Sequence, residues 1–300
     1  MLCSTSFIDS ASWGQILQDG FDARRLEIPL EETAPLAWTI FRKMQIRVAY
    51  ARFPVGLERN AISPDHFARA VLPRLRTARA DIARVSIVGS VQLSQFGWVH
   101  EAELIESVIE DLQGWSEKRV ARSVRAKLNK GQSAGVVVRS ARLDEGGLIY
   151  QMYAEMIARH KGRLRYTRKY FNALCRASLW ERRLSIGVVC DTNGVPAGFI
   201  VVCHSPCSSH YLHSGFRSGF SRLRPGYCAM AWAIEQSREF GSRKFNMLTS
   251  PVDQPSLVAY KESFGATSSP RQHYAVPLNW VGRMLLLRRL AAHSQRPGPG

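Results

Sequence analysis

The sequence lacks the features that mark membrane-spanning, secreted and nucleotide-hydrolysing proteins. No run of about 18 or more apolar residues is present, so no segment is expected to cross a bilayer. The first residues, MLCSTSFIDS, do not combine a basic region with an apolar core, so no secretory signal is expected. Neither a Walker phosphate loop nor a GxGxxG fingerprint occurs. We therefore expect a cytoplasmic protein, with association at a membrane surface left open.

Cysteine and acidic residues are both scarce. The cysteines are scattered, which favours reduced thiols in a cytosolic protein over a disulfide framework. They are Cys3, Cys175, Cys190, Cys203, Cys207 and Cys228. Asp and Glu number 24 against 41 Lys and Arg, so the formal net charge is +17. Such an excess favours polyanionic partners such as nucleic acid, anionic lipid or nucleotide-linked substrates, or it reflects arginine-rich solvated faces.

Hydrophobic residues are ample for packed cores, and the 300-residue length suits two domains. The order strand, loop, helix, strand is predicted over residues 46–89 and again over residues 209–249. The shared order indicates two copies of one α/β unit. The loop of the first copy, residues 54–61, carries a single arginine, so we expect it to hold no cofactor. It either helps to wall a substrate cleft or is purely structural.

The second copy has a basic loop before its helix. Residues 217–224 form this loop, and Pro225 suits the first helical turn because its missing N–H would be unpaired there anyway. Gly241 is expected to end the helix in a left-handed conformation. A helix N-terminus behind basic residues is a ready site for an anion such as phosphate.

The remaining elements are predicted from hydrophobic spacing and turn residues. Asn193-Gly194 is the strongest hairpin signal. Helices are predicted over residues 12–17, 116–131, 148–160, 166–177 and 280–292, and strands over residues 25–30, 37–41, 98–104, 135–140, 184–190 and 198–203. In the helix 116–131, Ser116 and Gly131 are expected to be the caps. The segment 294–300 is expected to be disordered.

Two motifs resemble those of acyltransferases. The loop Arg222-Leu-Arg-Pro-Gly-Tyr-Cys228 is similar to the pyrophosphate-binding loop of GNAT acyltransferases, Arg/Gln-x-x-Gly-x-Gly/Ala, with one residue more. The string Tyr260-Lys261-Glu262-Ser263-Phe264-Gly265 resembles the Phe-Lys-x-x-Phe-Gly ending of the FemAB-like branch of that superfamily. That branch includes peptidoglycan aminoacyltransferases and acyltransferases of exopolysaccharide pathways. The resemblance covers most of residues 105–280.

The resemblance implies an α/β fold of tandem GNAT-like halves, each a mixed, mostly antiparallel sheet flanked by helices. Its expected division is a degenerate N-terminal half over residues 1–112, a basic connecting helix over residues 113–131, a catalytic half over residues 132–280, and a basic amphipathic segment with a tail over residues 281–300. The connecting helix carries Arg122 and Arg125, which either face a substrate phosphate or are simply solvated. The segment 280–292 could lie on anionic lipid or pack on the protein.

The resemblance also implies site residues for direct attack of an amine or hydroxyl on a thioester. The donor-binding residues would be Arg222, Arg224, Gly226, Tyr227, Leu212 and Ser214. Lys261 would stabilise the developing negative charge, and Tyr260 could protonate the leaving thiolate. His213 and Asp253 are candidate general bases. Each of these residues could instead be structural, for example with Tyr260 packed on the sheet.

The donor is expected to be acyl-CoA, in particular acetyl-CoA, with aminoacyl-tRNA as the alternative. The acceptor would be a small molecule or a sugar linked to a nucleotide or lipid. A non-catalytic protein that binds nucleic acid or other anions is a further alternative. Zinc is not expected, because the Cys/His-rich segment 203–213 reads as two strands with a turn, whose alternate residues face opposite ways.

Overall fold

The computed structural model describes residues 6–30, 35–52, 62–88 and 91–294, which fall into two compact units. Unit 1 comprises Met1–Gly20, Glu106–Leu248 and Ser256–Ser268, and unit 2 comprises Phe21–Ile105, Thr249–Pro255 and Ser269–Gly300. Strands β5 (Val99–Ile109) and β11 (Thr267–Pro277) contribute residues to both units. None of the helices in the described ranges is long and apolar enough to cross a membrane.

Unit 1 is built on a mixed sheet with the strand order β10-β9-β8-β7-β6. The pairs β9–β8, β8–β7 and β7–β6 are antiparallel, and only β10 runs parallel to β9. The strands are β6 (Val137–Ser140), β7 (Leu184–Cys190), β8 (Pro196–Cys203), β9 (Ser208–Phe216) and β10 (Lys244–Pro251). Gly194 has a φ of +74°, which agrees with the hairpin predicted between β7 and β8.

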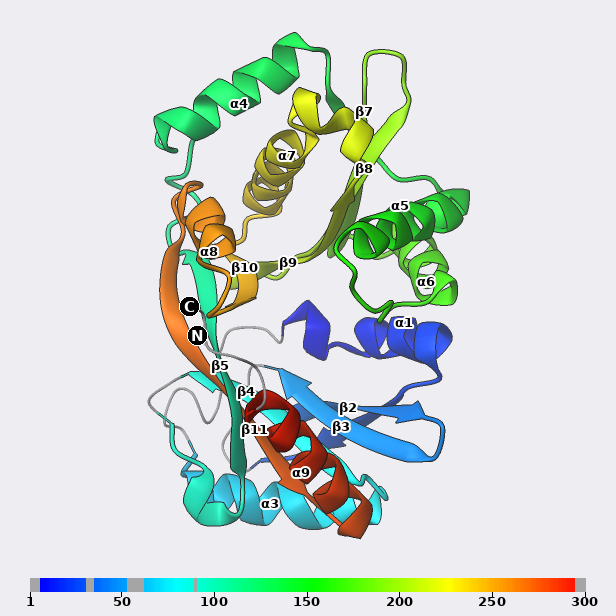
Figure 1. Cartoon of the computed structure of the whole chain (residues 1–300), viewed down its shortest axis with the longest axis vertical. Coiled ribbons are helices and arrows are strands. Elements are labelled where there is room, and N and C mark those ends of the chain that lie inside the picture. The colour runs from blue at the N-terminus through cyan, green and yellow to red at the C-terminus, as the bar shows by residue number, and fades with distance from the viewer. Residues whose placement is uncertain (1–5, 31–34, 53–61, 89–90, 295–300) are drawn as a thin grey trace. The chain divides into compact units, whose positions relative to one another are not determined.

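Helices cover both faces of this sheet. Helix α7 (Pro225–Glu239) lies on one face, and α5 (Gly146–Arg159) and α6 (Arg168–Ser178) lie on the other, as Figure 1 shows. Strand β8 is buried on both faces, because Ile200 packs in the core beneath α7 while Phe199 packs edge-on against Phe171 of α6. A strand covered on both sides should read as a continuous apolar run, and β8 does.

The basic connecting helix is shorter than predicted. Helix α4 spans Arg122–Ser133, so Ser116 does not cap it and Gly131 lies inside it. Both cap predictions were wrong. Gly131 instead allows close packing, because a Cβ there would lie 2.4 Å from the sulfur of Cys228 on α7. Val120, Val124 and Leu128, spaced four residues apart, are buried, with Val120 just before the helix.

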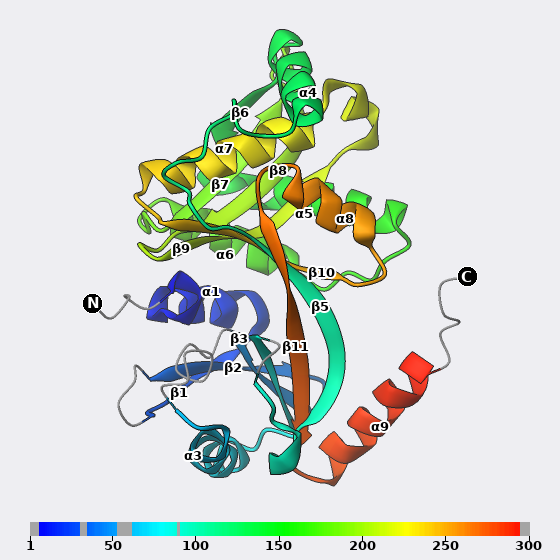
Figure 2. The ribbon, with the colours of Figure 1, turned by 90° about the vertical axis from the view of Figure 1, so that its left-hand side faces the viewer.

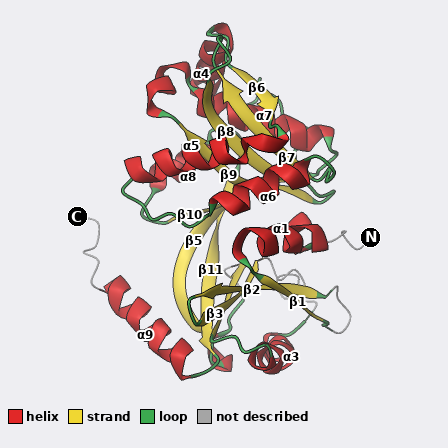
Figure 3. Cartoon of the chain, turned by 90° about the vertical axis from the view of Figure 1, so that its right-hand side faces the viewer, coloured by secondary structure: helices red, strands yellow, loops and turns green. Residues whose placement is uncertain are grey.

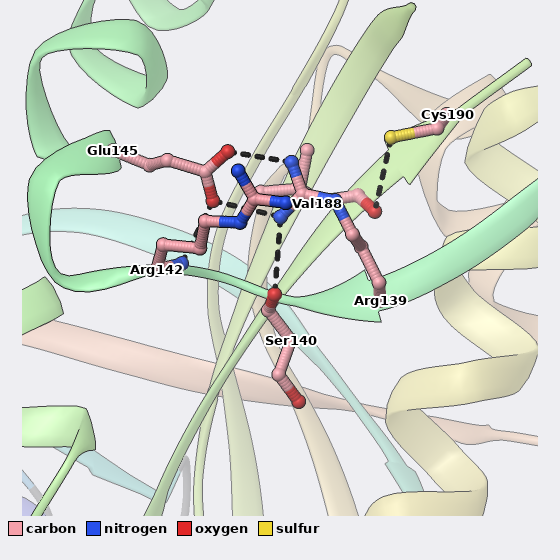
Figure 4. A network of polar contacts seen from close by, with 6 residues as sticks. All are labelled: Arg139, Ser140, Arg142, Glu145, Val188 and Cys190. Atoms are coloured by element: carbon pink, nitrogen blue, oxygen red, sulfur yellow. Dashed lines mark hydrogen bonds and ion pairs between the residues drawn. The ribbon is translucent and has the colours of Figure 1, made fainter. Parts of the chain in front are cut away.

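An ion pair fastens the start of α5 to the edge strand β6. Glu145 precedes α5 and accepts two hydrogen bonds from the guanidinium of Arg139, at 2.8 and 2.5 Å (Figure 4). Its carboxylate also accepts the backbone N–H of Arg142 at 2.7 Å. The hydrogen bond from Arg139 is the main reason why the pKa of Glu145 is lowered and that of Arg139 is raised. We call these three residues the α5 clamp.

Unit 2 repeats the strand, helix, strand order of unit 1, as the sequence predicts. Its sheet has the order β1-β2-β3-β4-β11, in which only β3 and β4 are parallel. The elements are β1 (Arg24–Ile28), β2 (Leu36–Lys43), β3 (Ile46–Arg52), α3 (Pro64–Thr77), β4 (Ile82–Val88) and α9 (Trp280–Ser294). Trp38, Phe67 and Trp98 are completely or nearly completely buried in its separate core. Residues 54–61 of the predicted non-cofactor loop and the tail from residue 295 lie outside the described ranges.

The two parallel pairs differ in length. In unit 2, β3 and β4 pair at five positions, from Val48–Ile82 to Arg52–Ser86. In unit 1, β9 and β10 pair at only three, ending at His210–Asn246. The parallel strands β3 and β4 of unit 2, the unit that the sequence marks as degenerate, therefore stay paired, whereas β9 and β10 of unit 1 separate after three pairs.

Candidate functional site

The candidate site begins where β9 and β10 stop pairing. Their last shared pair is His210–Asn246, and the next residues of each strand are not paired with each other. Leu212 coincides with a register shift in the pairing of β9 with β8, so the backbone of β9 is irregular at the same level. Main-chain groups released from a ladder need other partners, and a bound substrate can supply them.

A backbone irregularity in β10 marks the same level. Leu248 has a φ of +57°, a left-handed conformation that a leucine rarely adopts. Its N–H donates to the side-chain oxygen of Asn246 at 2.7 Å, and its carbonyl accepts from Nζ of Lys261 at 2.8 Å. The amide nitrogen of Asn246 in turn donates to Glu106 of β5 at 2.9 Å. We call these four residues the β10 network.

Lys261 is the charged centre of this network. Its side chain is buried, and this burial lowers the pKa of its ammonium group to about 8, although the nearby carboxylate of Glu106 acts in the opposite direction. An ammonium group has three donors, so the hydrogen bond to Leu248 does not exhaust it. A buried amine with a pKa near the physiological range is a common property of functional sites.

Tyr260 ties the same short helix, α8 (Pro255–Glu262), to the start of α7. Its hydroxyl donates to the carbonyl of Gly226 at 3.1 Å, while its ring packs edge-on against Tyr227 and Phe264. Burial raises the pKa of Tyr260 well above the usual value, so the phenol stays protonated. Consecutive residues of α8 therefore hold the beginning of α7 and the irregularity in β10.

The basic loop leads directly into α7. It contains a 3-10 turn over Ser218–Leu223, and Arg224 precedes the helix with a left-handed φ of +55°. Pro225 occupies the first helical position, as predicted. Arg222 and Arg224 are exposed, so their guanidinium groups can reach a ligand in solvent. Gly241 follows the helix with a φ of +90°, also as predicted.

Helix α4 adds further positive charge beside this loop. Lys127 donates to the hydroxyl of Tyr227 at 2.8 Å, and its ammonium also lies 4.7 Å from the centre of that ring. Arg122 and Arg125 are exposed on the same helix. The two groups of basic residues that the sequence offers as candidate phosphate ligands, on α4 and before α7, thus lie on neighbouring elements.

His213 faces the helices on the other side of the sheet. Its Nε2 and the hydroxyl of Tyr170 are hydrogen-bonded at 2.7 Å, and its ring contacts Tyr166 edge-on at 4.4 Å. Tyr170 is held from behind by Trp13 of α1 (Ala11–Phe21), which lies beside α6 in Figure 3. The imidazole therefore has an aromatic surrounding and a hydroxyl partner, which suits either a base or a structural role.

The other predicted residues have simpler surroundings. Ser214 hydrogen-bonds the hydroxyl of Tyr211 at 2.5 Å, which draws it toward the α7 side of β9. Leu212 is half-buried. Asp253 is exposed and belongs to unit 2, so it is not part of the geometry described for unit 1 and stays a prediction.

The Cys/His-rich segment has hydrogen-bond partners of its own. His204 contacts the hydroxyls of Ser209 and Ser185 through its two ring nitrogens, and burial lowers its pKa to about 4. Within the described ranges, no group of three or more Cys, His, Asp and Glu side chains could hold a metal ion. Cys175, Cys190, Cys203 and Cys228 are buried, and Cys175, Cys190 and Cys228 have free thiols. Cys207 is disulfide-bonded, which corrects the expectation of reduced thiols for that residue.

Sequence reasoning missed the partners that hold the site. Asn246 offered a signal, because asparagine is depleted in the middle of strands. Tyr166 and Tyr170 offered another, since residues four apart share a helix face. Glu106 and the conformation of Leu248 had no local signal, because both depend on contacts between distant segments.

The comparisons with known proteins relate this chain to the acyltransferases of the GNAT type. Residues 118–262 match the family model described as the acetyltransferase (GNAT) domain. The predicted resemblance to the FemAB-like and GNAT acyltransferases is thereby confirmed. The comparison with curated proteins gave no match.

Solved structures share the fold at low identity. The crystal structure of FemX superposes with a TM-score of 0.67 at 11% identity and covers 93% of this chain and 94% of its own. L-PGS from Bacillus licheniformis gives 0.58 at 16% identity, with 92% and 90% covered. A tandem GNAT protein from the clavulanic acid biosynthesis pathway gives 0.51 at 13%, with 83% and 81% covered. The predicted tandem GNAT-like fold is therefore correct.

Proposed function

We propose that this protein transfers an acyl group from acyl-CoA to an amine or hydroxyl of a small molecule or of a sugar-containing precursor. The observation that carries the proposal is the early end of pairing between β9 and β10, after His210–Asn246. It leaves room for the acyl–pantetheine arm to pair with strand backbone in place of the missing neighbour. In unit 2, β3 and β4 remain paired with each other, so their backbone groups are not open to such a ligand.

The chemistry would be a direct attack. The acceptor nitrogen or oxygen forms a bond to the thioester carbonyl carbon, the C–S bond breaks, the acceptor loses a proton and the thiolate gains one. The ammonium of Lys261 would stabilise negative charge on the carbonyl oxygen, an effect worth roughly 3–4 kcal/mol for one well-placed donor. Tyr260, kept protonated by burial, would protonate the thiolate, and His213 would accept the proton of the acceptor.

The anionic end of the donor would lie at the start of α7. Arg222 and Arg224 supply guanidinium groups there, and the helix dipole favours negative charge. Tyr227 and Gly226 would line this end, with Leu212 and Ser214 along β9. Acceptor phosphate, if present, would contact Arg122 and Arg125 on α4.

Aminoacyl-tRNA is a second candidate donor, and one observation favours it. Helix α4 touches α7 through Lys127 and Tyr227, so the basic residues of α4 extend the positive surface beyond what a pyrophosphate needs. An extended run of cations suits a nucleic-acid backbone. FemX and L-PGS have the same fold, but at their level of identity this likeness supports neither donor over the other.

A donor screen tests the proposal. Acetyl-CoA, longer acyl-CoAs and deacylated tRNA are added separately, and the melting temperature is measured, because a ligand that binds only the folded state raises it. We expect acyl-CoA to raise the melting temperature. For the variant Arg222→Ala, about tenfold more acyl-CoA should be needed for the same rise. Arg182→Ala, in the exposed turn between α6 and β7, makes the same charge change and should have no effect. A response to tRNA alone would select the second donor, and no response to either would contradict both.

A further inference from the structure

Helix α9 has two apolar faces, and only one of them packs on the part of the protein that the structure describes. Leu286 is buried against Ile82 and Ala275, with Leu285 and Leu290 partly buried beside it. Gly282 allows this close approach, since a Cβ there would lie 1.8 Å from the carbonyl oxygen of Asp81. These contacts fix which side of α9 faces unit 2 and which side faces away.

The outward face carries large apolar side chains. Trp280 is 77% exposed, Met284 is 48% exposed and Leu287 is 53% exposed. Their spacings of four and three residues place them in one stripe along the helix. We call these three residues the α9 stripe. Scattered exposed hydrophobic residues are ordinary, but an aligned stripe that begins with tryptophan marks an interaction surface.

Charge on the same helix narrows the kind of partner. At 100° per residue, Arg283 falls on one side of the stripe and Arg288 on the other, and both are exposed. Residues 280–294 contain no Asp or Glu. Arg289 is also exposed, but it pairs with Glu101 of unit 2 at 3.4 Å. The surface is therefore an apolar strip bordered by two cations.

We propose that α9 lies in the plane of an anionic lipid surface, with the α9 stripe at the boundary of headgroups and acyl chains. Arginine side chains can keep their charge among phosphates while their stems lie along apolar chains. Tryptophan favours this boundary because its ring is apolar and its N–H is polar. Helices with an apolar strip, a basic border and no acidic residue bind such interfaces. Binding of α9 to lipid would not depend on which acyl donor the protein uses.

Vesicle sedimentation tests the proposal with the full chain. One set of vesicles contains phosphatidylcholine alone, and the other contains phosphatidylcholine with phosphatidylglycerol. We expect the wild type to bind the second set. The triple variant Trp280→Ser/Met284→Ser/Leu287→Ser should bind these vesicles at least about tenfold more weakly. The matched control is Leu179→Ser/Trp180→Ser, which removes two similarly exposed apolar side chains between α6 and β7 and should bind as the wild type does.

Charge variants, melting temperatures and tryptophan quenching distinguish lipid binding by α9 from unfolding or self-association. The double variant Arg283→Gln/Arg288→Gln should lose the preference for anionic vesicles, and the melting temperature of every variant should match the wild type because the changed side chains are exposed. In vesicles of brominated lipid, the wild type should be quenched more than Trp280→Phe. Unchanged binding of the triple variant would overturn the proposal. So would self-association in solution that disappears in the triple variant while vesicle binding is absent from the wild type.

Discussion

At the scale of single residues, Lys261 combines a buried position with a titratable charge. Its Nζ donates to the carbonyl of Leu248 at 2.8 Å, and burial lowers its pKa to about 8. A charge-stabilising role needs the protonated form, whereas a role as a base needs the neutral amine. Both roles are compatible with the geometry, so the pH dependence of turnover can tell the cation role from the base role.

The pH profile of turnover should identify the role of Lys261. As pH rises through about 8 the ammonium group loses its proton, so kcat should fall if the cation stabilises negative charge. Lys261→Arg keeps the charge over the whole range and should remove this fall, while Lys261→Met should lower kcat about 100-fold with little change in donor KM. The measurement is kcat between pH 6 and 10. A kcat that rises through pH 8 would contradict the cation role.

The amino-acid sequence indicated Lys261 but not its surroundings. The motif Tyr260-Lys261 marked both residues, and the structure shows them fastening α7 and β10. The left-handed Leu248 could not be predicted, because leucine has no local preference for that conformation and a lysine far along the chain holds it there. His213 was predicted as a candidate general base, but its hydrogen-bond partner Tyr170, which comes from α6, was not predicted.

At the scale of elements, spacing and turn residues predicted most helices and strands. Strand β7 has the predicted bounds, and Pro225, Gly194 and Gly241 act as their chemistry requires. The beginning of α4 was misplaced because Ser116 has the right residue type for a cap. The helix instead begins at Arg122, directly after Ala121, whose N–H donates to the distant carbonyl of Ser263 at 3.2 Å. Residue type reports local preference, and packing decides where an element starts.

The α5 clamp should contribute to stability in a pH-dependent way. The pKa of Glu145 is lowered in the folded state, mainly by Arg139, so its contribution is present above the unfolded pKa and is lost as pH falls through the folded value. Glu145→Gln should cost about 1–3 kcal/mol near neutral pH, because hydrogen bonds to a charged group are lost. Urea unfolding at neutral and acidic pH measures this.

The control for the clamp is Glu155→Gln. Glu155 also pairs with an arginine, Arg217, but its side chain is 42% exposed, compared with 11% for Glu145, so the change should cost little. The difference between wild type and Glu145→Gln should shrink in acid. An equal difference at both pH values would show that the clamp acts through packing alone.

At the scale of the whole molecule, the repeated element order in the sequence predicted two related halves, and the structure contains them. The sequence could not show which of the two parallel strand pairs stops pairing early, because strand pairing depends on residues brought together by folding. Unit 2 places its helix α3 beneath the paired strands, while α9 packs on the same unit through β4 (Figure 2). The two parallel pairs, five positions against three, are the clearest difference in architecture between the halves.

Both parallel strand pairs occur in one polypeptide. The pair β3–β4 can therefore serve as an internal standard when deuterium uptake is measured at β9 and β10. Peptides covering residues 211–212 and 247–248 should take up label faster than those covering residues 50–52, where the ladder continues. Acyl-CoA should slow uptake in the first two and leave the third unchanged. Mass spectrometry of a single sample would read both. Uniform slowing in all three peptides would mean that the ligand stiffens the chain globally and does not complete a sheet.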